Sequence, residues 1–98
     1  TAVEVGIAYG ESIDRAIEVL KDEMEKTTDI EDILETPVVA GVSSLGDSAV
    51  NLKIVAKCKV KTAAGVSAEL RRRIKNRFDA EGIEIPFPQQ VVHLVKEA

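Results

Sequence analysis

Few residues of this chain have types and spacings that could do chemistry. His93 is the only histidine, and it lies in the alternating run VVHLV, where no nucleophile is placed beside it for a base to activate. Cys58 is the only cysteine, which excludes an internal disulfide framework and a cysteine-based metal site within one chain. Cys58 falls on the apolar side of a strand-like run, which indicates a buried, inert thiol. We therefore expect no catalytic site, no metal site and no cofactor.

Residues 41–48, GVSSLGDS, contain two glycines and three serines, the composition of some phosphate-binding loops. Such a loop ends in Gly-Lys-Ser/Thr and leads into a helix, whereas the run that follows here is strand-like. A hairpin turn is the better interpretation. A small hydrolase of the acylphosphatase type would also need an anion loop with a paired arginine and asparagine, and no convincing one is present. The sequence thus predicts that the protein is not an enzyme.

A dense basic run, RRRIKNR at residues 71–77, is the one sequence feature typical of nucleic-acid binding. Acidic residues lie four positions from its cations, in the pairs Glu69–Arg73, Lys75–Asp79 and Arg77–Glu81. Such pairs stabilise a helix surface by about 0.2–0.5 kcal/mol each. Residues 11–36 hold ten acids and three bases, and residues 53–77 hold nine bases and one acid. We interpret this asymmetry as two neighbouring helices of opposite charge.

Residues 49–61, AVNLKIVAKCKVK, alternate between an apolar and a cationic face. The apolar face carries Val50, Leu52, Ile54, Ala56, Cys58 and Val60. The opposite face carries Lys53, Lys57, Lys59 and Lys61, so we expect a half-buried strand. A cationic sheet face could bind an anionic ligand or nucleic acid, and a binding module of this kind remains an alternative function. RNA-recognition sheets also need stacking aromatics, which this strand lacks, so we predict no nucleic-acid partner.

The elements that carry these residues follow a recognisable order. Residues 2–9 alternate as a strand, residues 12–26 have one apolar helical stripe, and two strand-like runs flank residues 46–48. A second amphipathic helix covers residues 64–82, and residues 83–85, IEI, resume a strand. This order predicts an α+β, ferredoxin-like βαββαβ fold with two helices on one face of an antiparallel sheet. The first strand should lie between the third and fourth, with Glu4 and Glu84 on the same open face as the lysines.

The length of 98 residues indicates one domain, and 45% hydrophobic with 31% charged residues is typical of a soluble globular protein. No apolar stretch approaches the length of about 18 residues that a membrane span needs. Pro86 and Pro88 interrupt the last strand, after which QVVHLV is again strand-like. From these residues alone, a local kink that ends the fold is as good an interpretation as a division into a domain at residues 1–88 and an extended segment at residues 89–98.

Two stretches, YGESIDRAIEVL and RFDAEGIEIPFPQQVVHL, resemble the cytoplasmic C-terminal region of the small-conductance mechanosensitive channel (MscS) family. The intervening PVVAGVSSLGDSAVNLKI also looks like the hairpin of that family, so the resemblance covers nearly the whole chain. The most specific part is the run Gly-Ile-x-Ile-Pro-Phe-Pro-Gln. In this sequence the run consists of Gly82, Ile83, Ile85, Pro86, Phe87, Pro88 and Gln89.

The resemblance implies a homo-oligomer, typically a heptamer, with a hollow cage on the cytoplasmic side of the cell membrane. The α/β domain would form the lower cage, and the segment after Pro86 and Pro88 would join strands of neighbouring subunits in a small barrel. The cage would support assembly and screen solutes without catalysis. Because this sequence contains no pore helices, the resemblance also implies a soluble fragment of a longer channel.

Overall fold

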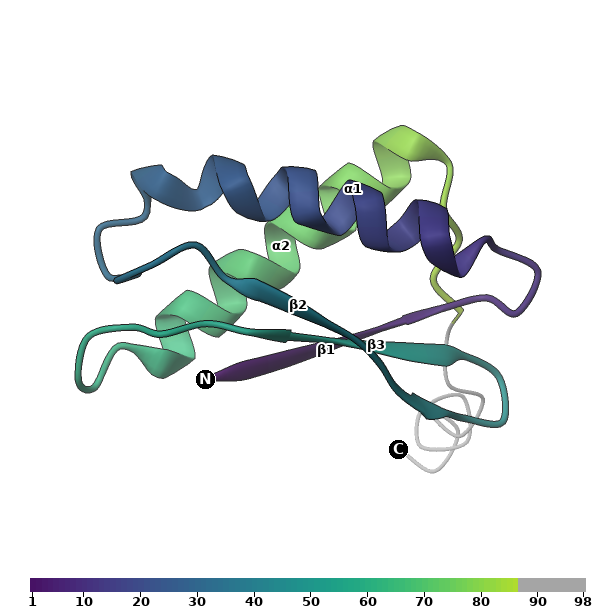
Figure 1. Ribbon diagram of the computed structural model, residues 1–98, viewed down its shortest axis with the longest axis horizontal. Coiled ribbons are helices and arrows are strands. Elements are labelled where there is room, and N and C mark those ends of the chain that lie inside the picture. Colours follow the sequence, from purple (N-terminus) through teal and green to yellow (C-terminus); the bar gives the residue numbers. More distant parts are fainter. Residues whose placement is uncertain (87–98) are drawn as a thin grey trace, which may run out of the picture.

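The computed structural model describes residues 1–86, and these form one antiparallel sheet covered on one face by two helices (Figure 1). The strands are β1 (Ala2–Ile7), β2 (Val38–Leu45) and β3 (Val50–Val55), in the sheet order β1-β3-β2. The helices are α1 (Ile13–Glu25) and α2 (Ala63–Glu81), and a short 3₁₀ helix, η1 (Lys26–Asp29), follows α1. The α+β fold class predicted from the sequence is therefore confirmed.

The alternating pattern of β1 and β3 places one set of side chains under the helices. Val3 pairs with Ile54, Val5 with Leu52 and Ile7 with Val50. Five of these six side chains are buried, and Val5 is partly buried. On the open face Glu4 lies directly opposite Lys53, as predicted for the charged ladder. Such an opposite-charge pair contributes about 0.2–1 kcal/mol.

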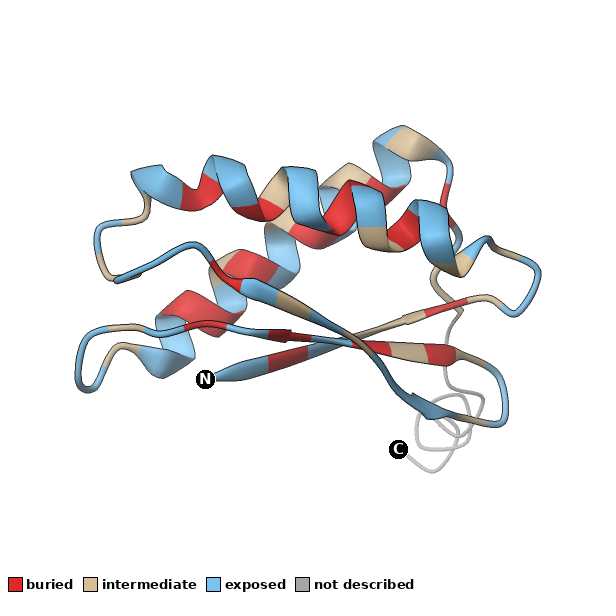
Figure 2. Ribbon diagram, in the orientation of Figure 1, coloured by how far each residue is buried: buried red, intermediate tan, exposed pale blue. Residues whose placement is uncertain are grey.

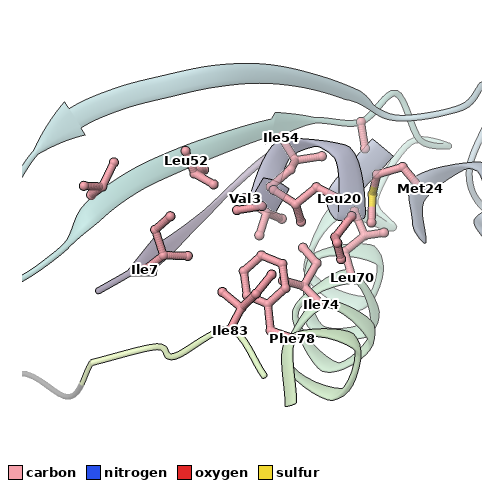
Figure 3. Packing of buried hydrophobic residues seen from close by; sticks show 14 of the residues in the cluster. Val3, Ile7, Leu20, Met24, Leu52, Ile54, Leu70, Ile74, Phe78 and Ile83 are labelled. Carbon is pink, nitrogen blue, oxygen red and sulfur yellow. The ribbon is translucent and has the colours of Figure 1, made fainter. Parts of the chain in front are cut away.

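Both helices contribute a buried stripe to the core (Figures 2 and 3). The helix positions predicted from the spacing are buried at Ala16, Leu20 and Met24 on α1 and at Val66, Leu70, Ile74 and Phe78 on α2. Ser12 caps α1, because its Oγ accepts a hydrogen bond of 3.2 Å from the backbone N–H of Arg15. Within residues 1–86 no helix is both long and apolar enough to cross a bilayer.

The predicted cationic face of four lysines is wrong, because β3 ends at Val55 rather than at Lys61. The chain turns there to begin α2: Lys61 has a φ of 70°, the Thr62 N–H donates to the Lys59 carbonyl, and Val60 is 87% exposed. Two of the lysines pair with acids of the segment before β2. Lys57 lies 3.2 Å from Glu35, and Lys59 lies 3.8 Å from Glu31. Lys53 alone of the four lies on a strand.

The fourth strand expected at residues 83–85 does not form a ladder in the described part of the chain. One backbone hydrogen bond of 3.0 Å joins the N–H of Ala8 to the carbonyl of Glu84, so the segment does approach β1 as the fold requires. Pairing stops there for two reasons. The N–H of Glu84 donates to the Glu11 carboxylate instead, and Pro86 has no N–H to donate.

The basic run of α2 faces the acidic helix α1 and the end of η1. Arg73 contacts Asp29 and Glu69, each at 2.8 Å. Arg77 contacts Asp22 at 2.8 Å and Glu23 at 3.1 Å on α1, and Glu81 at 2.9 Å on its own helix. Together with Lys75–Asp79, these contacts confirm the three predicted helix pairs. The basic run therefore joins the two helices, as the charge asymmetry indicated.

From these ion pairs we predict that the folded domain becomes less stable in acid. Hydrogen bonds from Arg72, and next from Arg73, lower the pKa of Glu69 to about 2, and a hydrogen bond from Arg77 lowers the pKa of Asp22. A carboxylate with a depressed pKa in the folded state stabilises the fold above its unfolded-state pKa. That stabilisation should be lost as the pH falls from about 4.5 towards about 2.

Circular dichroism melting between pH 6 and pH 2 measures this effect. The melting temperature should fall through that window, and Glu69→Gln should make the fall shallower while lowering the melting temperature at pH 6. Glu31→Gln is the control, because the Glu31 side chain is 91% exposed and approaches Lys59 only to 3.8 Å. Identical pH profiles for Glu69→Gln and the wild type would contradict the prediction.

Candidate functional site at the exit junction

The exit segment, which we define as Gly82–Pro86, leads the chain out of α2. Gly82 has a φ of 74°, a left-handed conformation that costs glycine little. The N–H of Gly82 donates to the Asp79 carbonyl at 3.3 Å, and the N–H of Ile83 donates to the Phe78 carbonyl at 2.9 Å. These are the two hydrogen bonds of a Schellman motif. Ile83 is 3% exposed and belongs to the same core cluster as Phe78, so the predicted cap and its apolar contact are confirmed.

Three residues from the start of the chain hold the exit segment in place. The Glu84 carbonyl accepts from the N–H of Ala8 at 3.0 Å, and the Glu84 N–H donates to the Glu11 carboxylate at 2.8 Å. Arg15 Nη2 donates to the Glu81 carbonyl at 2.7 Å, which satisfies one of the carbonyls left open in the last turn of a helix. We call this arrangement of Ala8, Glu11 and Arg15 around the exit segment the exit junction.

Sequence reasoning missed Glu11 and Arg15, the two side chains of the exit junction. Glu11 precedes the helix cap Ser12, and Arg15 lies in the first turn of α1, so local patterns assign both only to a helix start. Their partners at Glu81 and Glu84 are more than 60 residues away in the sequence. The one available signal was the joint presence of YGES and the Gly-Ile-x-Ile-Pro run, which does not show that the two segments touch.

The loop that carries Glu11 is itself fixed at both ends. Tyr9, which is 52% exposed, donates a hydrogen bond from its hydroxyl to the Gly46 carbonyl in the β2–β3 turn. Ser12 caps α1 at the other end of the loop. The loop is therefore held between the hairpin turn and the first helix, and it presents Glu11 to the exit segment.

The run predicted from the sequence to leave the domain is described only in part. Gly82, Ile83, Ile85 and Pro86 lie in the exit segment as stated above, with Ile85 partly buried against the core. Phe87, Pro88 and Gln89 lie outside the described residues, as does the extended segment at residues 89–98. Pro86 is the last residue of this run that the structure describes.

The edge of the sheet that lies away from β1 and the exit junction is also unpaired among the described residues. β2 is the outermost strand there, and three of its apolar side chains are exposed, Val38 at 62%, Val42 at 44% and Leu45 at 69%. Two register shifts, between Val39 and Gly41 and between Val42 and Ser44, interrupt its pairing with β3. Among residues 1–86 no strand pairs with the outer edge of β2. An edge strand with exposed apolar side chains is a surface suited to association.

The described residues contain no cluster of three or more His, Cys, Asp or Glu side chains that could hold a metal ion. Cys58 is partly buried and forms an isolated β-bridge with Ile33. His93 lies outside the described residues. The exit junction itself consists of backbone bonds, one carboxylate and one guanidinium, an arrangement that orients a chain segment.

Comparison with known proteins gives consistent matches. Residues 2–85 match the family model described as mechanosensitive ion channel MscS, C-terminal. A small-conductance mechanosensitive channel of Caldanaerobacter subterraneus subsp. tengcongensis is 30% identical over 95 residues, which are 94% of this chain and 33% of that protein. An uncharacterised MscS family protein of Archaeoglobus fulgidus is 37% identical over 94 residues, which are 95% of this chain and 32% of that protein.

The fold also matches a solved structure, the crystal structure of Helicobacter pylori MscS in its closed state. The TM-score is 0.72 with 32% sequence identity, over 89% of this chain and 35% of that chain. This chain thus spans about a third of the length of the relatives that it matches.

Proposed function

This chain belongs to the MscS family of mechanosensitive ion channels, and from that premise we propose that it forms a wall of the channel's cytoplasmic cage. In this role the domain has no catalytic activity. It supports assembly of the homo-oligomer, a heptamer by resemblance to the family, and it frames the path by which solutes reach the pore. The full-length channel would carry this domain on the cytoplasmic side of the cell membrane.

The observation that carries the proposal is the exit junction. Ala8 and Glu11 each bind Glu84, and these two bonds hold the exit segment beside the end of β1. Pro86 and Pro88 each lack a backbone N–H, which limits how far the last segment can pair with β1. The exit junction is suited to directing residues 89–98 towards strands of neighbouring subunits.

The open edge of β2 supports the same proposal. Val38, Val42 and Leu45 are exposed along one strand at the end of the sheet, and β1 occupies the other end. A ring of identical subunits would cover part of this apolar edge in each copy. Heterologous contacts of this kind close into rings when the rotation between subunits permits.

Truncation of the tail tests the proposed function. In the full-length channel, a stop after Pro88 should shift the oligomer towards smaller species, measured by size exclusion with light scattering in detergent. The same truncation of the 98-residue chain should leave its melting temperature nearly unchanged, because residues 89–98 pair with other subunits. Removal of residues 96–98 alone is the control and should leave assembly intact. A full-length protein that assembles normally after the stop at Pro88 would contradict the inter-subunit role of the tail.

The alternative, a binding module that uses a cationic sheet face, has less support. Lys57 and Lys59 lie outside β3 and contact Glu35 and Glu31. The lysine that remains on the strand, Lys53, lies opposite Glu4, whose carboxylate also accepts a hydrogen bond from Ser43. This face is therefore close to charge balance and offers an anion no concentrated positive charge.

A further inference from the structure

A groove of about 210 Å³ lies between the outer edge of β1 and helix α2. Its apolar lining comes from Val3, Val5, Ile74 and Ile85, and Arg71 and Lys75 stand along it on α2. Val5 and Ile85 are only partly buried, although both pack against the core cluster. The groove therefore exposes apolar surface at the point where the exit segment ends.

Among residues 1–86, the backbone groups on the outer side of β1 along this groove pair with no strand. Thr1 and Ala56 exchange two backbone hydrogen bonds, of 2.7 and 2.8 Å. Because alternate residues of an antiparallel strand point their N–H and C=O groups to the same side, those of Val3 and Val5 point towards β3. Those of Glu4 and Gly6 must then point outwards into the groove. The bond from the Ala8 N–H to Glu84 follows the same alternation.

An antiparallel continuation from the Ala8–Glu84 bond sets a definite register for the residues that follow. It places residue 86 opposite Gly6, residue 87 opposite Val5 and residue 88 opposite Glu4. In this register both prolines would occupy positions whose N–H points at β1, and their carbonyls could still accept hydrogen bonds from the N–H groups of Gly6 and Glu4. Side chains two residues apart in an extended chain share a face, so Phe87 would lie on the same side as Ile85, over the groove.

We propose that the groove is the docking site for the side chain of Phe87, in the same chain. The volume suits one aromatic ring, since an apolar cavity of about 150 Å³ accommodates benzene. The ring would cover Val5 and Ile85, and the cations of Arg71 or Lys75 could lie over its face. Ile85 and Phe87 each precede a proline, which disfavours helical backbone and keeps this stretch extended.

Docking of Phe87 would compensate for the hydrogen bonds that the two prolines remove. They weaken the fourth strand as a ladder, because each removes a donor, and the aromatic side chain between them supplies an apolar anchor instead. The chain is then fixed up to Pro88 and free to leave the domain from Gln89. This anchor acts within one subunit and does not depend on the proposed assembly of residues 89–98.

Nuclear magnetic resonance and melting of the 98-residue chain test the proposal. Nuclear Overhauser effects should connect the ring protons of Phe87 with methyl groups of Val5 and Ile74. Phe87→Ala should lower the melting temperature by about 4–8 °C, the shift expected for a modest loss of apolar burial in a domain of this size. Phe87→Leu should retain part of that stability. Val91→Ala, an apolar truncation beyond Pro88, is the matched control and should melt with the wild type.

The outcomes separate this proposal from the proposed function. Absence of the Phe87 contacts, or equal melting of Phe87→Ala and the wild type, would overturn the docking of Phe87 and leave the inter-subunit role of the tail untouched. A destabilisation by Val91→Ala as large as that by Phe87→Ala would also overturn it, since the effect would not be specific to the groove. Normal assembly after truncation at Pro88 would contradict only the proposed function.

Discussion

Phe78→Ala should lower the free energy of unfolding by about 3–5 kcal/mol, the cost of removing a fully buried aromatic ring from a close-packed core. The Phe78 side chain has no exposed surface and lies between α2, β1 and the exit segment (Figure 3). Its loss would leave a cavity beside Ile74 and Ile83, both of which are nearly inaccessible to solvent. A domain of this size has a total stability of about 5–15 kcal/mol, so the variant should be close to the limit of folding.

Urea denaturation followed by circular dichroism measures this change. Phe78→Leu should lose much less stability, because leucine refills most of the cavity. Val60→Ala is the exposed control: Val60 is 87% exposed, and its truncation should leave the transition midpoint unchanged. A Phe78→Ala midpoint near that of the wild type would mean that the ring does not fill the core as the structure has it.

Arg77→Leu should lower the free energy of unfolding by about 1–2 kcal/mol. The Arg77 side chain is 19% exposed and contacts three carboxylates, those of Asp22, Glu23 and Glu81. Without the guanidinium Glu23 would lose its cation, and within residues 1–86 Asp22 and Glu81 would keep only Lys26 and Arg15, each at 3.4 Å. The partial exposure of the cluster keeps the expected loss below the range for a fully buried pair.

The control for Arg77→Leu is Arg72→Leu on the same helix. Arg72 contacts only Glu69 among the described residues and is 59% exposed, so its replacement should cost less stability than that of Arg77. Added salt should narrow the difference between Arg77→Leu and the wild type, because it screens the attraction that the variant has lost. Equal denaturation midpoints for the two variants at low salt would contradict a special role for Arg77.

The sequence predicted best those features that arise from local periodicity. The buried residues of α2, from Val66 to Phe78, follow their four-residue spacing, and the left-handed Gly82 with the apolar Ile83 forms the cap that the pattern indicated. Glu4 opposite Lys53 follows from the strand order of the fold. In each case the observed feature depends on residues a few positions away in the sequence, or on a fold topology that has few alternatives.

Features that depend on distant partners were not predictable. The alternation from Ala49 to Lys61 fits a strand of 13 residues. β3 nevertheless ends at Val55, because the chain has to turn into α2 and because Lys57 and Lys59 contact acids before β2. Likewise, nothing near Glu11 indicates that its carboxylate binds the N–H of Glu84, 73 residues away. That bond, rather than strand propensity, decides how far the last segment pairs.

The positions of the two ends of the described chain determine how the domain responds to mechanical force. Thr1 is bonded to Ala56 at one end of β1, and the exit segment is bonded to Ala8 at the other end. A pull between residue 1 and residue 86 is therefore directed along β1. Such a pull loads the hydrogen bonds between β1 and β3 together, in shear, rather than opening them one after another like a zipper. From this geometry we expect the domain to resist extension between residues 1 and 86.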